Sequence, residues 1–117
     1  MNKALVAAGA IDAGLAVAAG AFGAHALKDR LEPRALEIFE TAARYQMYHA
    51  LAIILCAVLA TSGARTAGWI MQAGIVVFSG SLYALALTDV KVLGAITPIG
   101  GLAFLVGWTW LAVSALR

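Results

Sequence analysis

Charged side chains are scarce in this sequence of 117 residues. They make up 12% of it, against 63% hydrophobic residues, whereas soluble domains are about a quarter charged and about half apolar. This shortage excludes an ordinary soluble domain. The net charge of +2 supplies no basic surface for nucleic acid, so nucleic acid is not an expected partner.

Cysteine and histidine are too few for a metal site. Cys56 is the one cysteine, which excludes an internal disulfide framework and a cysteine–metal cluster. The two histidines, His25 and His49, fall short of the three or four protein ligands that a zinc site needs. We therefore expect no metal and no other cofactor.

Recognisable catalytic motifs are absent as well. The sequence has no G-x-S-x-G elbow, no glycine-rich phosphate loop and no pair of carboxylates at catalytic spacing. Its 12 glycines are scattered at helix-packing intervals within apolar stretches. The residues thus give no support for an enzyme, although they do not exclude one.

Long apolar runs are what the sequence has in excess, and its mean hydropathy is +0.93. Four runs are long enough to cross about 30 Å of hydrocarbon as helices, namely residues 5–27, 45–61, 66–88 and 96–116. The connections between them are too short for a soluble domain. We therefore predict an all-α fold, an integral membrane four-helix bundle that forms a single transmembrane domain over residues 1–117.

Most of the charge lies between the first two runs. Residues 28–44 hold eight charged side chains, four of each sign. Pro33 suits the first turn of a helix, and Phe39 and Ala43 follow at the spacing of one apolar face. We predict that this interfacial amphipathic segment extends the second helix, which enters the membrane near Tyr45.

Two further patterns concern the first and last helices. The first is built largely of alanine and glycine, and small residues let helix backbones approach closely in lipid. We therefore expect this helix to be central in the bundle. In the last run, Thr97 followed by Pro98 is typical of an N-cap and a first turn, so we expect that helix to begin there.

The distribution of basic residues predicts an orientation. Five of the eight lie on the side of the charged segment, and three lie on the side of both termini. By the positive-inside rule, the charged segment then faces the cytoplasm and the termini lie outside.

Asp12 is the most costly residue to place in a membrane. An aspartate at the centre of a span raises the free energy of insertion by about 2.5–3.5 kcal/mol, and the apolar residues around it lower that free energy by little more than this. Gln72, in the third run, enters from the same side at a similar depth. We expect a hydrogen bond between Asp12 and Gln72, and an ionisable group here could also serve as a proton or cation site.

The two histidines flank the charged segment and define a second candidate site. A hairpin between the first two helices could bring His25 and His49 together, with Tyr45 one turn before His49 and Arg44 beside it. Such a cluster could titrate near neutral pH, hold a lipid headgroup or simply cap the helices.

Three stretches carry a resemblance to a known family: GAFGAHALK, FETAARYQMYHALA and LGAITPIGGLAFLVGW. In order and spacing they resemble a family of small four-span integral membrane proteins typified by bacterial YgdD and YwdK. The resemblance implies a multi-pass protein of the bacterial inner membrane, with both histidines in the family pattern. It implies no activity, because the family is one of unknown function.

Three functions remain open at this point. The first is an accessory, assembly or lipid-interacting membrane protein, whose partners are membrane lipids and either further copies of itself or another membrane protein. The second is a small proton-linked carrier or conduit that uses Asp12 and the cluster of His25 and His49. The third is a membrane enzyme that acts on a lipid or a quinone. The sequence favours the first.

Overall fold

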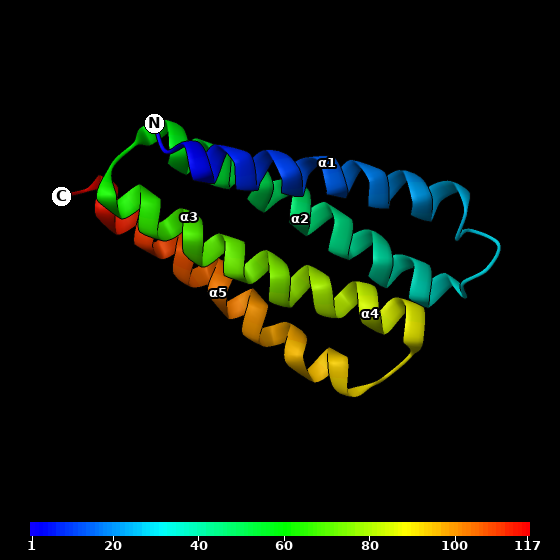
Figure 1. Ribbon diagram of the computed structural model, residues 1–117. Coiled ribbons are helices and arrows are strands. Elements are labelled where there is room, and N and C mark those ends of the chain that lie inside the picture. The colour runs from blue at the N-terminus through cyan, green and yellow to red at the C-terminus, as the bar shows by residue number, and fades with distance from the viewer.

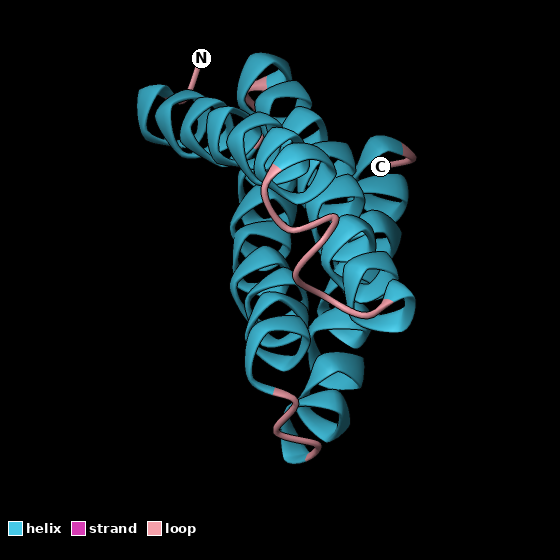
Figure 2. Ribbon diagram, turned by 90° about the vertical axis from the view of Figure 1, so that its right-hand side faces the viewer, coloured by secondary structure: helices cyan, strands magenta, loops and turns pink.

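The computed structural model describes residues 1–117 as helices joined by short turns, without strands (Figure 2). The helices are α1 (Lys3–His25), α2 (Pro33–Leu59), α3 (Ser62–Gly74), the π-helical turn η1 (Ile75–Ser79), α4 (Gly80–Thr88) and α5 (Val92–Ala115). Because α3, η1 and α4 run on as one helix, Ser62–Thr88, four helices are long and apolar enough to cross a membrane. The predicted all-α membrane bundle is confirmed.

The helices pack as a bent row. Both termini lie at one end of the molecule, and the α1–α2 and α4–α5 turns lie at the other (Figure 1). α2 contacts α1 as well as α3, η1 and α4, and α5 packs on α3, η1 and α4. The molecule measures 49 × 26 × 18 Å, so it is thin, and only 28 of its 117 residues are buried.

The central helix is α2, and the expectation that the first helix is central is wrong. Within the most apolar stretch of each helix, 50% of the residues are buried in α2 but only 22% are buried in α1. α1 presents a single small-residue stripe to α2, with Gly23 against Phe39, while Gly14 and Gly20 have nothing close to them. The buried residues of α2 include five alanines and a cysteine, which allow close approach from more than one neighbour.

The charged segment forms the start of α2, as predicted. Pro33 lies in the first turn, and the helix continues without a break into its apolar part. Phe39 and Ala43 are buried, while Glu40 and Arg44 on the opposite face are exposed. The predicted amphipathic extension of the second helix is therefore confirmed.

α5 begins at Val92, so the start expected at Thr97 and Pro98 is wrong. Pro98 lies inside the helix, where it removes one backbone hydrogen bond. The Thr97 hydroxyl donates to the Leu93 carbonyl at 3.1 Å and lies 2.6 Å from the Ser81 hydroxyl. Neighbouring hydroxyls and helices are what make proline tolerable inside a membrane helix.

Glycine is required where α5 crosses the π-helical turn. A methyl group at Gly100 would overlap the backbone of Phe78, so any larger residue would force the two helices apart. This close approach sets the position of α5, and Phe104 and Trp108 of that helix then reach across to α2.

Candidate functional site

Three polar side chains lie at a common depth inside the bundle. Asp12 is nine residues from the start of α1, His49 ten residues from the end of α2, and Gln72 ten residues from the start of α3. At about 1.5 Å per residue, all three lie about 14–15 Å from the end that holds the termini. They are therefore well inside the apolar part of the molecule.

Gln46 ties three helices together. Its Nε2 donates to the backbone carbonyl of Asp12 on α1 at 2.7 Å, and its Oε1 accepts from the Tyr83 hydroxyl on α4 at 2.8 Å. The side chain is only 5% exposed, and polar groups without partners are costly in hydrocarbon. Gln46 thus fixes the position of α1 and α4 on α2.

Asp12 and Gln72 lie near each other, and the hydrogen bond expected between them stays a prediction. Their polar atoms are incompletely paired, however. Asp12 Oδ2 and Gln72 Oε1 are both buried and have no hydrogen-bond partner. Two acceptor oxygens without donors make this the least satisfied place in the interior.

His49 makes a hydrogen bond through each ring nitrogen. Nδ1 lies 2.7 Å from the Tyr45 carbonyl, and Nε2 accepts from the indole N–H of Trp108 on α5 at 3.0 Å. The carbonyl needs a donor and the indole needs an acceptor, so this pattern assigns the neutral tautomer with its proton on Nδ1. Both nitrogens are thereby engaged within the protein.

An aromatic cluster surrounds His49. The imidazole stacks on Phe104, with ring centroids 3.5 Å apart and planes 7° from parallel. Tyr45 packs on Phe78 with centroids 5.1 Å apart, and Tyr48 packs on Tyr45 at 5.6 Å. These rings join α2, η1 and α5 on one side of the bundle, where the backbones of α2 and α5 do not meet closely.

The structure does not bring His25 and His49 together. Gly23, two residues before His25, packs on Phe39, which lies ten residues or about 15 Å from His49 along α2. The reason is that α2 begins at Pro33 and lies alongside α1 from its first turns, so the turn between the helices is much shorter than the charged segment. His25 is exposed at the end of α1.

Of the two other members of that predicted cluster, only Tyr45 lies against His49. Arg44 is exposed and donates to the Thr41 hydroxyl on its own helix at 3.3 Å. Tyr45 contributes its backbone carbonyl and its ring to the surroundings of His49. Tyr45 and His49 are therefore neighbours, whereas His25 and Arg44 lie apart from them.

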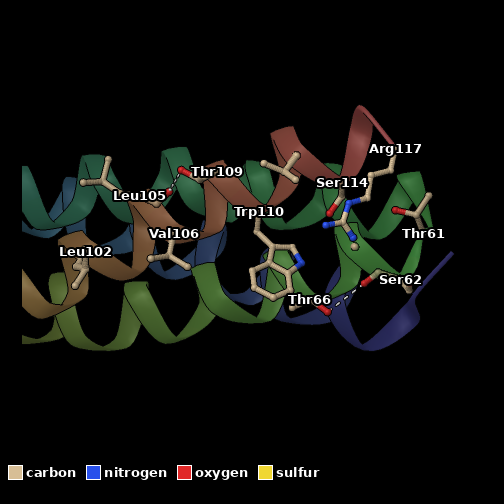
Figure 3. A pocket seen from close by; sticks show the side chains of 12 residues that line it. Thr61, Ser62, Thr66, Leu102, Leu105, Val106, Thr109, Trp110, Ser114 and Arg117 are labelled. Carbon is tan, nitrogen blue, oxygen red and sulfur yellow. Dashed lines mark hydrogen bonds between the residues drawn. The ribbon is translucent and has the colours of Figure 1, made fainter.

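A groove of about 910 Å³ lies between the start of α3 and the end of α5. Figure 3 shows its side chains, which change character along its length. The end near the termini is mainly polar and is lined by Thr61, Ser62, Thr66, Ser114 and Arg117, with Val113 beside them. The part farther from the termini is lined by Leu102, Leu105 and Val106, and Thr109 and Trp110 lie between the two parts.

No three side chains of histidine, cysteine, aspartate or glutamate lie together as metal ligands would. A buried hydroxyl also links two helices, because the Ser79 hydroxyl of η1 donates to the Ala42 carbonyl of α2 at 2.8 Å.

The family described as "Protein of unknown function (DUF423)" matches residues 19–101 of the chain. The chain belongs to this family. It is 47% identical to the UPF0382 membrane protein YwdK of Bacillus subtilis (strain 168) over 98% of both chains. It is 47% identical to a UPF0382 membrane protein of Staphylococcus epidermidis, covering 98% of this chain and 97% of the relative. No solved structure matches the sequence.

This DUF423 protein is thus a membrane protein of unknown function, as the resemblance implied. The region matched by the family model includes Gln46, His49 and Tyr83, but Asp12 and Trp108 lie outside it. Sequence reasoning did not select Gln46 as a site residue. The available signal was an amide side chain three residues before His49, on the same face of an apolar helix.

Proposed function

We propose that this DUF423 protein is an accessory membrane protein that interacts with lipid and catalyses no reaction. The observation that carries the proposal is the α3–α5 groove. It has a polar end near the end of the helices and an aliphatic wall deeper down, which is the arrangement of a lipid headgroup and its acyl chains. On α5 its lining runs from Leu102 to Ser114, or about 18 Å along the helix.

The interior of the bundle supports an accessory role. Gln46, Tyr83 and Ser79 all make bonds between helices, and His49 is held by hydrogen bonds and by a stacked ring. Such contacts stabilise one arrangement of the helices. They give no continuous row of unpaired polar groups along which a substrate or an ion could move.

We further propose a bacterial inner-membrane location, with association through copies of the chain or with another membrane protein. The outer face of α1 supports this proposal. Gly14 and Gly20 have nothing within 4 Å of the position a side chain would take, and Leu15 and Val17 beside them are exposed. A face with small and aliphatic residues suits close helix contact in a membrane.

Photo-crosslinking in vesicles tests the lipid interaction. The purified protein is placed in phosphatidylcholine vesicles that contain a phosphatidylcholine with a diazirine on its acyl chain. We expect label on residues 102–114 to exceed label on the equally lipid-exposed α1 residues several-fold, because the groove retains lipid. Val106→Trp fills the groove and should remove the excess, whereas Val58→Trp, at an exposed site on α2, should not. Label spread in proportion to exposure would overturn the proposal.

A proton-linked conduit is the second candidate, and it rests on the unpaired oxygens of Asp12 and Gln72. A proton on Asp12 Oδ2 would satisfy both oxygens, because the carboxyl could then donate to Gln72 Oε1. If the protein conducts protons, vesicles with the wild type should dissipate an imposed pH gradient and Asp12→Asn vesicles should not. Equal rates for both proteins and for empty vesicles would eliminate this candidate.

A further inference from the structure

We infer that the α3–α5 groove selects an anionic glycerophospholipid, with the phosphate at Arg117, Ser62 and Ser114 and one acyl chain against Leu105 and Val106. This inference rests on the proposed lipid interaction and names the lipid class. Four observations carry it: the charge at this end of the molecule, the free donors at the groove, its depth, and the position of Arg117.

The charged side chains at the end of the molecule that holds the groove are all basic. They are Lys3, Arg65 and Arg117, with no acidic side chain among them. The opposite end carries five basic and five acidic side chains. A polar site at this end is therefore complementary to negative headgroups, and each basic residue near a membrane surface attracts anionic lipid.

Arg117 is the charged side chain of the groove and has no carboxylate partner. The one ion pair of the structure joins Lys91 to Asp89 at the other end. Figure 3 shows the Arg117 side chain bent back over Ser114, at the end of the groove where Ser62 and Thr66 also lie. A guanidinium group in this position can offer two parallel N–H donors to a phosphate.

Further donors surround the same place. The Ser62 and Ser114 hydroxyls line the groove. Ser62 and Gly63 occupy the first turn of α3, where backbone N–H groups have no intrahelical acceptor and the helix dipole favours an anion. Carbonyl groups at the end of α5 would repel an anion, but two of them already accept hydrogen bonds. The Val113 carbonyl accepts from the Leu116 N–H, and the Ser114 carbonyl accepts from the Arg117 N–H.

The depth of the groove fits one leaflet. From Ser114 to Leu102 is twelve residues of α5, or about 18 Å, and half of the bilayer with its headgroup region is about 20–22 Å thick. The donors lie at the outer end, and Leu102, Leu105 and Val106 lie at the inner end. A phospholipid therefore enters with its headgroup at the membrane surface and its acyl chain along α5.

Native mass spectrometry of protein taken from mixed vesicles tests the inference. The vesicles contain phosphatidylglycerol, phosphatidylethanolamine and phosphatidylcholine in equal amounts, and the measured quantity is the ratio of retained phosphatidylglycerol to retained phosphatidylcholine. We expect the wild type to favour phosphatidylglycerol about fivefold, the effect of one basic side chain near a membrane surface. Arg117→Gln should bring the ratio close to one.

Arg65→Gln is the matched control, because it removes the same charge from the same end of the molecule outside the groove. It should leave the ratio within twofold of the wild type. A ratio near one in the wild type would overturn the inference while leaving the lipid interaction in place, and retention of no lipid at all would overturn both. An equal fall in the two arginine variants would also overturn it, because the preference would then arise from diffuse surface charge.

Discussion

Gly100→Ala should be among the most damaging single substitutions in this protein. The added methyl group would overlap the Phe78 backbone, and a backbone cannot turn aside as a flexible side chain can. Over-packing of this kind costs about 3 kcal/mol when the helices must separate. We expect a loss of that size in the free energy of unfolding, measured by titration with sodium dodecyl sulfate in mixed micelles.

Gly80→Ala is the control for this experiment. It makes the same chemical change at the start of α4, at a position with nothing within 4 Å, so its effect should stay within about 0.5 kcal/mol. If the two variants unfold alike, α5 does not cross η1 as closely as the structure describes.

His49→Ala should cost about 3 kcal/mol in the same assay. The substitution removes the ring that stacks on Phe104, leaves a cavity in the aromatic cluster and deprives the Trp108 indole of its acceptor. His49→Phe keeps a ring in the stack and loses the hydrogen bond, so it should cost about 1 kcal/mol. The tryptophan fluorescence of the protein should shift in both variants, because the surroundings of Trp108 change.

His25→Ala tests whether His25 and His49 interact, as the sequence suggested, or lie apart, as in the structure. His25 is exposed and about 15 Å or more from His49 along the bundle, so its loss should change stability by less than about 0.5 kcal/mol. The double variant should then equal the sum of the single variants. Effects of similar size that fail to add would show that the two histidines do interact.

The sequence predicted the helices well and their neighbours poorly. Hydropathy and Pro33 define four apolar helices and the amphipathic start of α2, because these depend on local composition. The neighbours of His49 depend instead on where the hairpin turns and on which residues of α1 and α2 then lie side by side, and no pattern within one helix shows this. The partners of Gln46 and Trp108 come from α1, α4 and α2, which no spacing within one helix reveals.

The local pattern of Thr97 and Pro98 also led to a wrong prediction of where the last helix begins. A threonine followed by proline has the same appearance at a helix start and inside a membrane helix, where a hydroxyl from a neighbour can support it. In the first helix, abundant small residues showed that close packing occurs but not on how many faces. The π-helical turn at Ile75–Ser79 has no sequence signature at all, since it contains neither proline nor glycine.

That π-helical turn has a consequence for the whole third span. A wide turn accommodates one residue more than an α-helical turn would, and each residue of an α-helix corresponds to a rotation of about 100°. η1 therefore acts as a phase shift between α3 and α4. It directs Tyr83 to Gln46 and Ser81 to Thr97. If η1 wound as regular α-helix with all five residues kept, both side chains would rotate away from their partners, whereas deletion of one residue would let the turn close as α-helix with both contacts in place.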